Sequence, residues 1–288
     1  MRAFSLSLAL AILLGLSGCA SDPASRDETL NWTAEKLYAE AQDELSSGNY
    51  AKAIALLQKL ESRYPFGRFA QQAQINTAYA HWKEGEMALA LAAIDRFTRL
   101  YPNHENLDYV LYLKGLINVN DRATLFSAYT GEDFAERDPR AAREAFDTFK
   151  ELVTRFPESK YAPDASARLQ FLINLLAQND VHVARYYLRR GAFLAAVNRA
   201  QQVTRQYQEA PAVEEALAQM VLGYDRLGLV DLRDDARRVL ALNYPKSAYL
   251  KHGYDPKVLG GLPADLRPDY RGMWSRFKFW EKLPSLGK

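Results

Sequence analysis

The only cysteine of the chain, Cys19, lies where its thiol could be acylated. One basic residue, Arg2, precedes an apolar stretch from Leu6 to Leu16, which is too short to cross a bilayer as a finished helix. The stretch runs into Leu-Ser-Gly-Cys, the pattern of a bacterial lipoprotein signal that is cleaved just before the modified cysteine. We therefore expect residues 1–18 to be a signal peptide and Cys19 to be the lipid attachment site. An ordinary secretory signal with an incidental cysteine is the alternative.

The residues that follow Cys19 predict a protein that is held at the outer membrane and faces the periplasm. Ala20 stands where an aspartate would favour retention in the inner membrane. Residues 19–32 are mostly small and polar, which is typical of a flexible tether. No later segment approaches the roughly 20 apolar residues that a spanning helix needs. Several acyl chains on one cysteine would supply a stable anchor.

Catalysis and cofactor binding find little support in the residue types. The four histidines are dispersed and show no metal-ligand spacing: His81, His104, His182 and His252. The chain has no phosphate-binding glycine loop and no G-x-S-x-G motif, and acylation would leave no free thiol. A net charge of +2 argues against a general nucleic-acid surface. We therefore predict a binding protein without enzymatic activity, metal or cofactor.

A repeat of 37 residues organises the mature chain. Gly48 and Gly85 are separated by this period, as are Gly191 and Gly228, and the pairs Tyr64-Pro65 and Tyr101-Pro102 show it too. Allowing one insertion before Phe156-Pro157 and another before Tyr207 gives five repeats: 33–65, 70–102, 107–157, 162–208 and 213–245.

Each repeat is predicted to form two helices. The glycine suits the left-handed stop of the first helix, and the proline ends the second. Alanines recur where the two helices must cross closely: Ala41 with Ala53, Ala78 with Ala90, and Ala184 with Ala196. This layout resembles the tetratricopeptide repeat. The sequence therefore predicts an all-α fold, an α-solenoid of five tetratricopeptide-like helix pairs, whose concave surface is lined by the first helix of each pair.

Aromatic residues on the first helices of repeats one to three (33–157) could form a peptide-binding groove. Such side chains give a large contact area at low entropic cost, which suits an extended peptide with aromatic residues. The alternative is that they only pack the helices together. The residues are Tyr38, Tyr79, Trp82, Tyr109 and Tyr112.

For two segments the sequence allows more than one role. The insertion 118–139 is long for a compact solenoid, and a structural plug is favoured over a binding loop. The C-terminal tail, 246–288, mixes proline and glycine with aromatic and basic residues. It could cap the last repeat, lie on a membrane interface or bind a partner subunit, and capping is favoured.

Several segments together resemble the BamD family of outer-membrane assembly lipoproteins, also called ComL or YfiO. They are the cysteine motif and the segments RYPFGRFAQQAQ (63–74), DYVLYLKGL (108–116), AERDPRAAREAF (135–146) and YYLRRGAFLAAVNR (186–199). The resemblance implies a scaffold of the β-barrel assembly machinery. Its partners would be the barrel-forming subunit, other assembly lipoproteins and unfolded outer-membrane protein precursors. The alternative is a periplasmic adaptor for peptidoglycan or cell-division enzymes.

The resemblance also implies that repeats four and five (158–245) contact the barrel-forming subunit. It places Arg199 at that surface, among basic residues of the fourth repeat that also include Arg185, Arg189, Arg190 and Arg205. Arginine side chains suit carboxylates on a protein partner. We expect Arg199 to lie on an exposed helix face, so that a charge reversal leaves the core intact. Solvated helix charges are the alternative.

Overall fold

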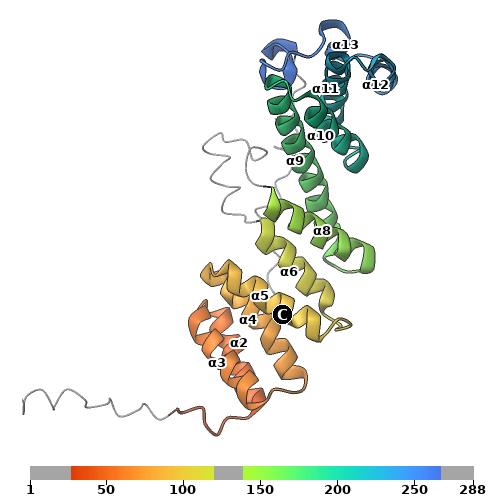
Figure 1. Cartoon of the computed structure of the whole chain (residues 1–288). Helices are drawn as coiled ribbons and strands as arrows, with labels where there is room; N and C mark the ends of the chain where they lie inside the picture. The colour runs from red at the N-terminus through yellow and green to blue at the C-terminus, as the bar shows by residue number, and fades with distance from the viewer. Residues whose placement is uncertain (1–26, 120–138, 267–288) are drawn as a thin grey trace, which may run out of the picture. The chain divides into compact units, whose positions relative to one another are not determined.

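The computed structural model describes residues 27–119 and 139–266, which form helices and turns and no β-strand. The helices follow one another in pairs along the chain (Figure 1). The predicted all-α fold is confirmed, and one pair falls in each predicted repeat. The pairs are α2 (Ala34–Ser46) with α3 (Tyr50–Arg63), α4 (Arg68–Glu84) with α5 (Met87–Leu100), α6 (Leu107–Val119) with α8 (Arg140–Arg155), α9 (Ala162–Arg189) with α10 (Phe193–Gln206), and α11 (Ala212–Leu227) with α12 (Val230–Asn243).

The turns within and after each pair follow the local chemistry of the sequence. Gly48 ends the turn after α2 with a φ of 79°, a conformation that glycine adopts without a steric penalty. At the end of α3, Tyr64 has a φ of −129° and a ψ of 66°, outside the helical region that the following Pro65 disfavours. The Tyr64 N–H still bonds to the carbonyl of Leu60. The predicted glycine and proline stops are therefore confirmed here.

The chain divides into two compact units, residues 1–80 and 81–288. In the first unit, α2, α3 and most of α4 share a core built around Leu37, Leu57, Leu60 and Ala73. In the second unit each helix packs on the next from α5 to α12, and α9 also reaches α11. One core cluster of this unit extends from α9 to the residues after α12.

The fourth repeat is longer because α9 itself is longer. This helix has 28 residues, whereas α2 and α6 have 13 each. The extra residues of the fourth repeat are therefore helical turns rather than a loop. At 1.5 Å per residue α9 is about 42 Å long, which lets one helix pack against α8, α10 and α11.

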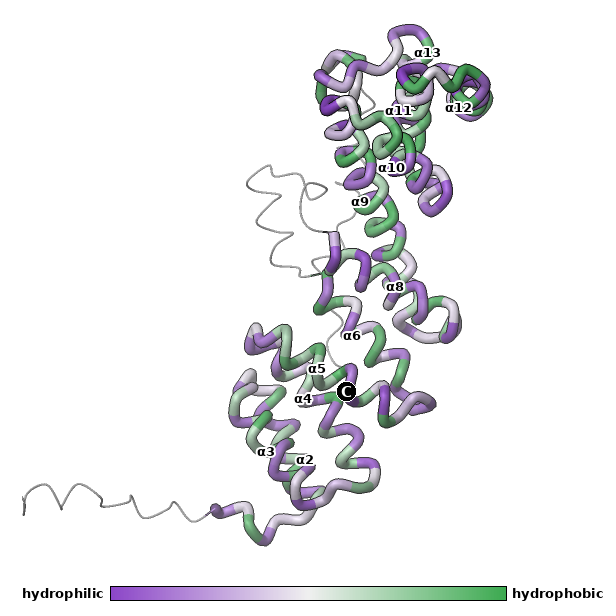
Figure 2. Tube along the Cα trace, in the orientation of Figure 1, coloured by the Kyte–Doolittle hydropathy of each residue, from purple (hydrophilic) through white to green (hydrophobic). Residues whose placement is uncertain are grey.

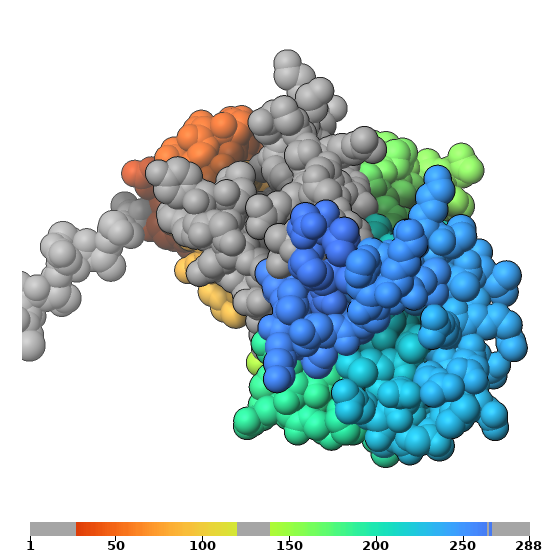
Figure 3. All heavy atoms as spheres, turned by 90° about the horizontal axis from the view of Figure 1, so that it is seen from above, coloured from red at the N-terminus to blue at the C-terminus, as the bar shows by residue number. Residues whose placement is uncertain are grey.

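The segment after the last pair closes the end of the repeat array. It contains α13 (Ala248–His252) and two short 3₁₀ turns, Leu259–Gly261 and Ala264–Leu266. Tyr249, Tyr254 and Leu262 are buried in the same core as α11 and α12. In Figure 3 the blue atoms of this segment lie over the end of the last repeat. Within its described part, the tail therefore caps the array.

The helices alternate apolar and polar residues along their length, and Figure 2 shows this as alternating green and purple on the tube. Among the described residues, no helix is both long enough and apolar enough to cross a membrane.

Candidate functional site

Several predicted sites lie outside the described residues. These are Cys19 with the signal peptide 1–18, most of the insertion 118–139, and residues 267–288 of the tail. Their predicted roles remain predictions.

Two of the five groove aromatics belong to the first unit, and both are half-buried between helices. Tyr38 lies on α2, where its hydroxyl accepts hydrogen bonds from Gln42 at 2.7 Å and Asn76 at 3.3 Å. Tyr79 lies on α4, with its ring edge-on to Tyr50 at 6.3 Å between centroids. Burial raises the pKa of the Tyr79 hydroxyl. Each ring thus packs on neighbouring helices and keeps part of its surface exposed.

The other three aromatics belong to the second unit. Trp82 is half-buried, with the Lys83 ammonium 5.1 Å from its ring centroid. Tyr109 is also half-buried and lies 5.5 Å from the ring of Tyr161. The five aromatics are therefore divided between the two units.

Tyr112 is a correction to the predicted groove. Its side chain is 1% exposed, stacks on Tyr161 at 4.9 Å and donates a hydrogen bond of 2.7 Å to Asp164. Burial, reinforced by that hydrogen bond, raises the pKa of Tyr112 above its usual range. The ring belongs to the core between α6 and its neighbours and offers a peptide no surface in this conformation.

Arg199 is a second correction, because its guanidinium forms an ion pair inside the protein. It donates to Asp180 of α9 at 3.0 Å, and Asp180 is completely buried. Arg143 of α8 approaches the same carboxylate oxygen at 3.5 Å. Burial raises the pKa of Asp180, although the charges of Arg199 and Arg143 oppose the shift. The Asp180 carboxylate therefore joins α9 to α8 and α10, and Arg199, whose side chain is 33% exposed, is not an unpaired charge on a free helix face.

Arg185 is also not part of a basic surface. It is 5% exposed and forms an ion pair of 2.5 Å with the buried Glu215 of α11. The Tyr254 hydroxyl donates to Glu215 at 2.8 Å and accepts from Arg185 and Gln219. Burial alone would lower the pKa of Arg185, but the charges of Glu215 and Tyr254 and the hydrogen bonds with both together outweigh it, and the pKa is raised. This network links α9 and α11 to the capping segment.

The last repeat carries an exposed apolar surface that the sequence reasoning missed. Only Ala236 and Leu240 of α12 are buried, so the other apolar residues of the helix are left outside. Six of the fourteen exposed large apolar side chains in the described part of the chain lie between residues 227 and 242. Residues 227–242 contain more leucine and valine than one buried helix face can hold, and this excess was the sequence signal for the surface. We call these six residues the α12 surface: Leu227, Leu229, Val230, Leu232, Val239 and Leu242.

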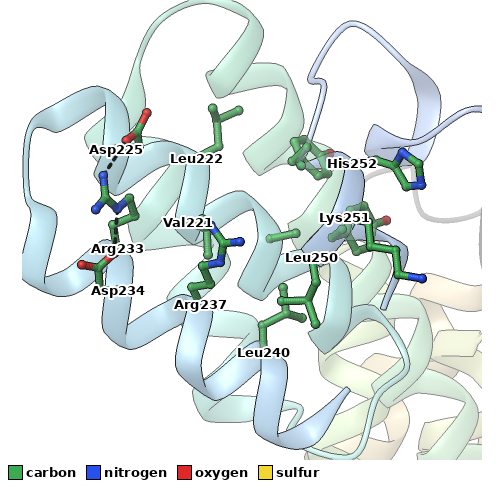
Figure 4. A pocket seen from close by; sticks show the side chains of 14 residues that line it. Val221, Leu222, Asp225, Arg233, Asp234, Arg237, Leu240, Leu250, Lys251 and His252 are labelled. Carbon is green, nitrogen blue, oxygen red and sulfur yellow. Dashed lines mark hydrogen bonds and ion pairs between the residues drawn. The ribbon is translucent and has the colours of Figure 1, made fainter. Parts of the chain in front are cut away.

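A pocket of about 570 Å³ opens between α11, α12 and α13 (Figure 4). Arg233 lines it and is held between Asp225 at 3.1 Å and Asp234 at 2.8 Å. The hydrogen bond from Arg233 lowers the pKa of Asp234. Arg237 and Lys251 line the same pocket from α12 and α13, beside the apolar Leu222, Leu240 and Leu250. The pocket thus combines apolar side chains with basic groups and with the acids Asp225 and Asp234. The described residues hold no cluster of side chains suited to a metal ion.

Comparison with known proteins shows the family. The family model YfiO, described as outer membrane lipoprotein, matches residues 31–240. "Outer membrane protein assembly factor BamD" of Neisseria meningitidis serogroup A is 49% identical over 252 residues, covering 86% of this chain and 94% of the relative. The protein of the same name from Vibrio cholerae is 40% identical over 243 residues, covering 84% and 99%.

Among solved structures, a Podosopora anserina protein with nearly identical TPR-like repeats is 13% identical and gives a TM-score of 0.34, covering 73% of this chain and 96% of the other. The family assignment depends on the sequence relatives alone. Because the family model spans most of the chain and these relatives align over nearly their whole length, the chain belongs to the YfiO family of outer membrane lipoproteins.

Proposed function

We propose that this protein is a lipid-anchored scaffold of the outer-membrane β-barrel assembly machinery. The observation that carries the proposal is the match to the assembly factor BamD across the whole repeat region. The anchor would be Cys19, and the body would face the periplasm. The repeat array would bind other polypeptides and perform no catalysis.

The late repeats are the proposed contact for the barrel-forming subunit. Support comes from the α12 surface, where apolar side chains remain exposed after the repeat has packed, and from the adjoining pocket. Exposed apolar side chains that gather on one face mark protein interfaces. Because Arg199 is paired internally, the proposed contact shifts from the α9–α10 region to α12.

Affinity purification from detergent-solubilised membranes tests this contact. Leu242 is 75% exposed, so Leu242→Ser should leave the melting temperature unchanged and reduce recovery of the barrel-forming subunit. Leu194→Ser on α10, where the leucine is 61% exposed, is the matched control and should leave recovery unchanged. Recovery of peptidoglycan or cell-division enzymes in place of the barrel subunit would favour the adaptor alternative.

The early repeats are the proposed receiver of unfolded barrel precursors. Tyr38, Tyr79, Trp82 and Tyr109 each keep part of their surface exposed, which supports a contact with aromatic residues of a precursor. The combined change Tyr79→Ala and Tyr109→Ala should weaken binding of a precursor C-terminal peptide in a fluorescence titration. Tyr112→Ala is the control for a core effect and should lower the melting temperature. Unchanged peptide affinity in a stably folded double variant would place the receiving site elsewhere.

A further inference from the structure

The point where the tether meets the first repeat is fixed by side-chain contacts. The Asp27 carboxylate pairs with Lys59 and with Arg63 of α3, each at 2.7 Å. Arg63 also donates to the carbonyl of Thr29, and the hydrogen bond from Lys59 is the main reason that the pKa of Asp27 is lowered. Residues 27–32, which the sequence assigns to the tether, are therefore held against the C-terminal end of α3.

The same end of the first unit exposes large apolar side chains. Phe66 is 91% exposed, the highest fraction among the large apolar side chains of the described residues, and Leu30 is 62% exposed. Both lie near one hydrogen bond, in which the Tyr64 hydroxyl donates to the carbonyl of Trp32 at 2.9 Å. Phe66 follows Tyr64 by two residues, and Leu30 precedes Trp32 by two. We call Leu30, Trp32, Tyr64 and Phe66 the tether patch.

The polar groups around the tether patch suit a membrane–water interface. The Lys36 ammonium lies 4.4 Å from the Trp32 ring centroid, and Arg68, next to the patch, is exposed. Lysine, arginine, tryptophan and tyrosine are the residues that favour this zone. The exposed acids Glu28 and Glu35 lie at the same end and balance the two bases. The exposed apolar side chains, more than attraction to anionic lipid, therefore favour a contact with the membrane.

The tether limits how far the tether patch can lie from the lipid anchor. Cys19 precedes Asp27 by eight residues, and eight residues span at most about 28 Å when fully extended. An acylated Cys19 would therefore keep the patch at a high local concentration of lipid. Among the described residues of the first unit, the other large apolar side chains are buried or half-buried between helices.

We propose that the tether patch inserts Phe66 and Leu30 into the lipid headgroup region. It would act as a second membrane contact beside the acyl chains and fix the orientation of the first repeat. The proposal depends on the lipid anchor at Cys19.

The test uses the full-length lipidated protein in vesicles of phosphatidylethanolamine and phosphatidylglycerol. Because Cys19 is the only cysteine and would be acylated, Phe66→Cys provides a unique thiol for an environment-sensitive fluorophore. Emission should shift to the blue and be quenched by lipids brominated on the acyl chain. Ser47→Cys is the matched control, since Ser47 is exposed at the other end of α3, about 20 Å away, and its label should stay in water.

The outcomes distinguish membrane contact by the tether patch from anchoring through Cys19. Labelling of the unmodified chain would show a free Cys19 and contradict the anchor. With an acylated Cys19, equal emission and quenching at positions 66 and 47 would overturn the tether patch. Adding Leu30→Ser to Phe66→Cys should reduce the quenching at least twofold, because the patch loses an apolar member. Quenching should be similar in phosphatidylcholine vesicles, and a loss there would mean that charge drives the contact.

Discussion

Asp180 is a buried acid that holds two arginines from neighbouring helices, and this arrangement decides what a substitution there does. Arg199→Glu would place a second carboxylate beside the buried Asp180. We expect the free energy of unfolding to fall by about 3 kcal/mol, since removing one partner of a buried pair leaves a charge uncompensated. Urea denaturation measures this loss. Arg205→Glu, at an exposed position on the same helix, should cost less than about 1 kcal/mol. Equal stability of the two variants would contradict the internal role of Arg199.

The buried Asp180 should also make the stability of the protein depend on pH. Its pKa is raised in the folded protein, so the folded state retains a proton that the unfolded chain releases near pH 4. The stability that this group contributes is thus complete below about pH 4 and falls as the pH rises through its folded pKa. Asp180→Asn removes this proton uptake. The stability of the wild type relative to Asp180→Asn should therefore decrease as the pH rises from about 3 to 7, measured by urea denaturation. A difference that does not change with pH would contradict the raised pKa.

The sequence could not show which arginines are internal. Asp180 lies 19 residues before Arg199 and 37 after Arg143. It lies on the first helix of its repeat whereas both arginines lie on second helices, so the repeat period does not pair them. Only the packing of α8, α9 and α10 brings the three side chains together. Tyr112 could not be assigned for a related reason: it lies on the helix face predicted to line the groove, and the ring of Tyr161 covers it.

At the scale of elements, glycines inside helices mark places where two helices approach closely. A methyl group on Gly115 of α6 would overlap the ring of Phe149 on α8. Alanine is the better helix former by about 1 kcal/mol. The overlap should outweigh this gain, so Gly115→Ala should destabilise the protein by about 1–3 kcal/mol. Thermal and urea unfolding measure the change.

A double-mutant cycle isolates the contact between α6 and α8. Phe149→Leu alone should destabilise by leaving a cavity in the core. Combined with Gly115→Ala, the total loss should be smaller than the sum of the single losses by at least about 1 kcal/mol, because the added methyl fills part of the space. Additive losses would show that the ring of Phe149 is not what excludes a larger side chain at position 115.

The elements themselves were largely predictable because glycine and proline act locally. The left-handed Gly48 and the stop before Pro65 follow from steric properties of those residues alone, and the 37-residue period repeats them. The extra length of α9 was not predictable in the same way. An insertion disturbs the period without indicating its own secondary structure, and here the inserted residues continue the helix.

At the scale of the whole molecule, the repeats depend on their neighbours, and the last repeat depends on the segment that follows it. In the second unit each helix buries its apolar face on the next. Such an array is stabilised mainly by contacts between adjacent elements. Without residues 248–266, the buried Leu217 and Leu240 would lose Tyr249, Tyr254 and Leu262 from their core cluster. The Arg185–Glu215 pair would also lose the Tyr254 hydroxyl.

Two truncations test this dependence. A chain that ends after Lys246 removes the described capping segment, and a chain that ends after Leu266 keeps it. The shorter chain should lose at least about 3 kcal/mol of stability, since removal of a single buried aromatic side chain already costs that much. Hydrogen exchange followed by mass spectrometry should show lost protection in α11 and α12, while α2 and α3 keep the protection seen in the longer chain. An equal loss in α2 and α3 would mean that the two units unfold as one, and full protection of α12 in the shorter chain would mean that the last repeat needs no cap.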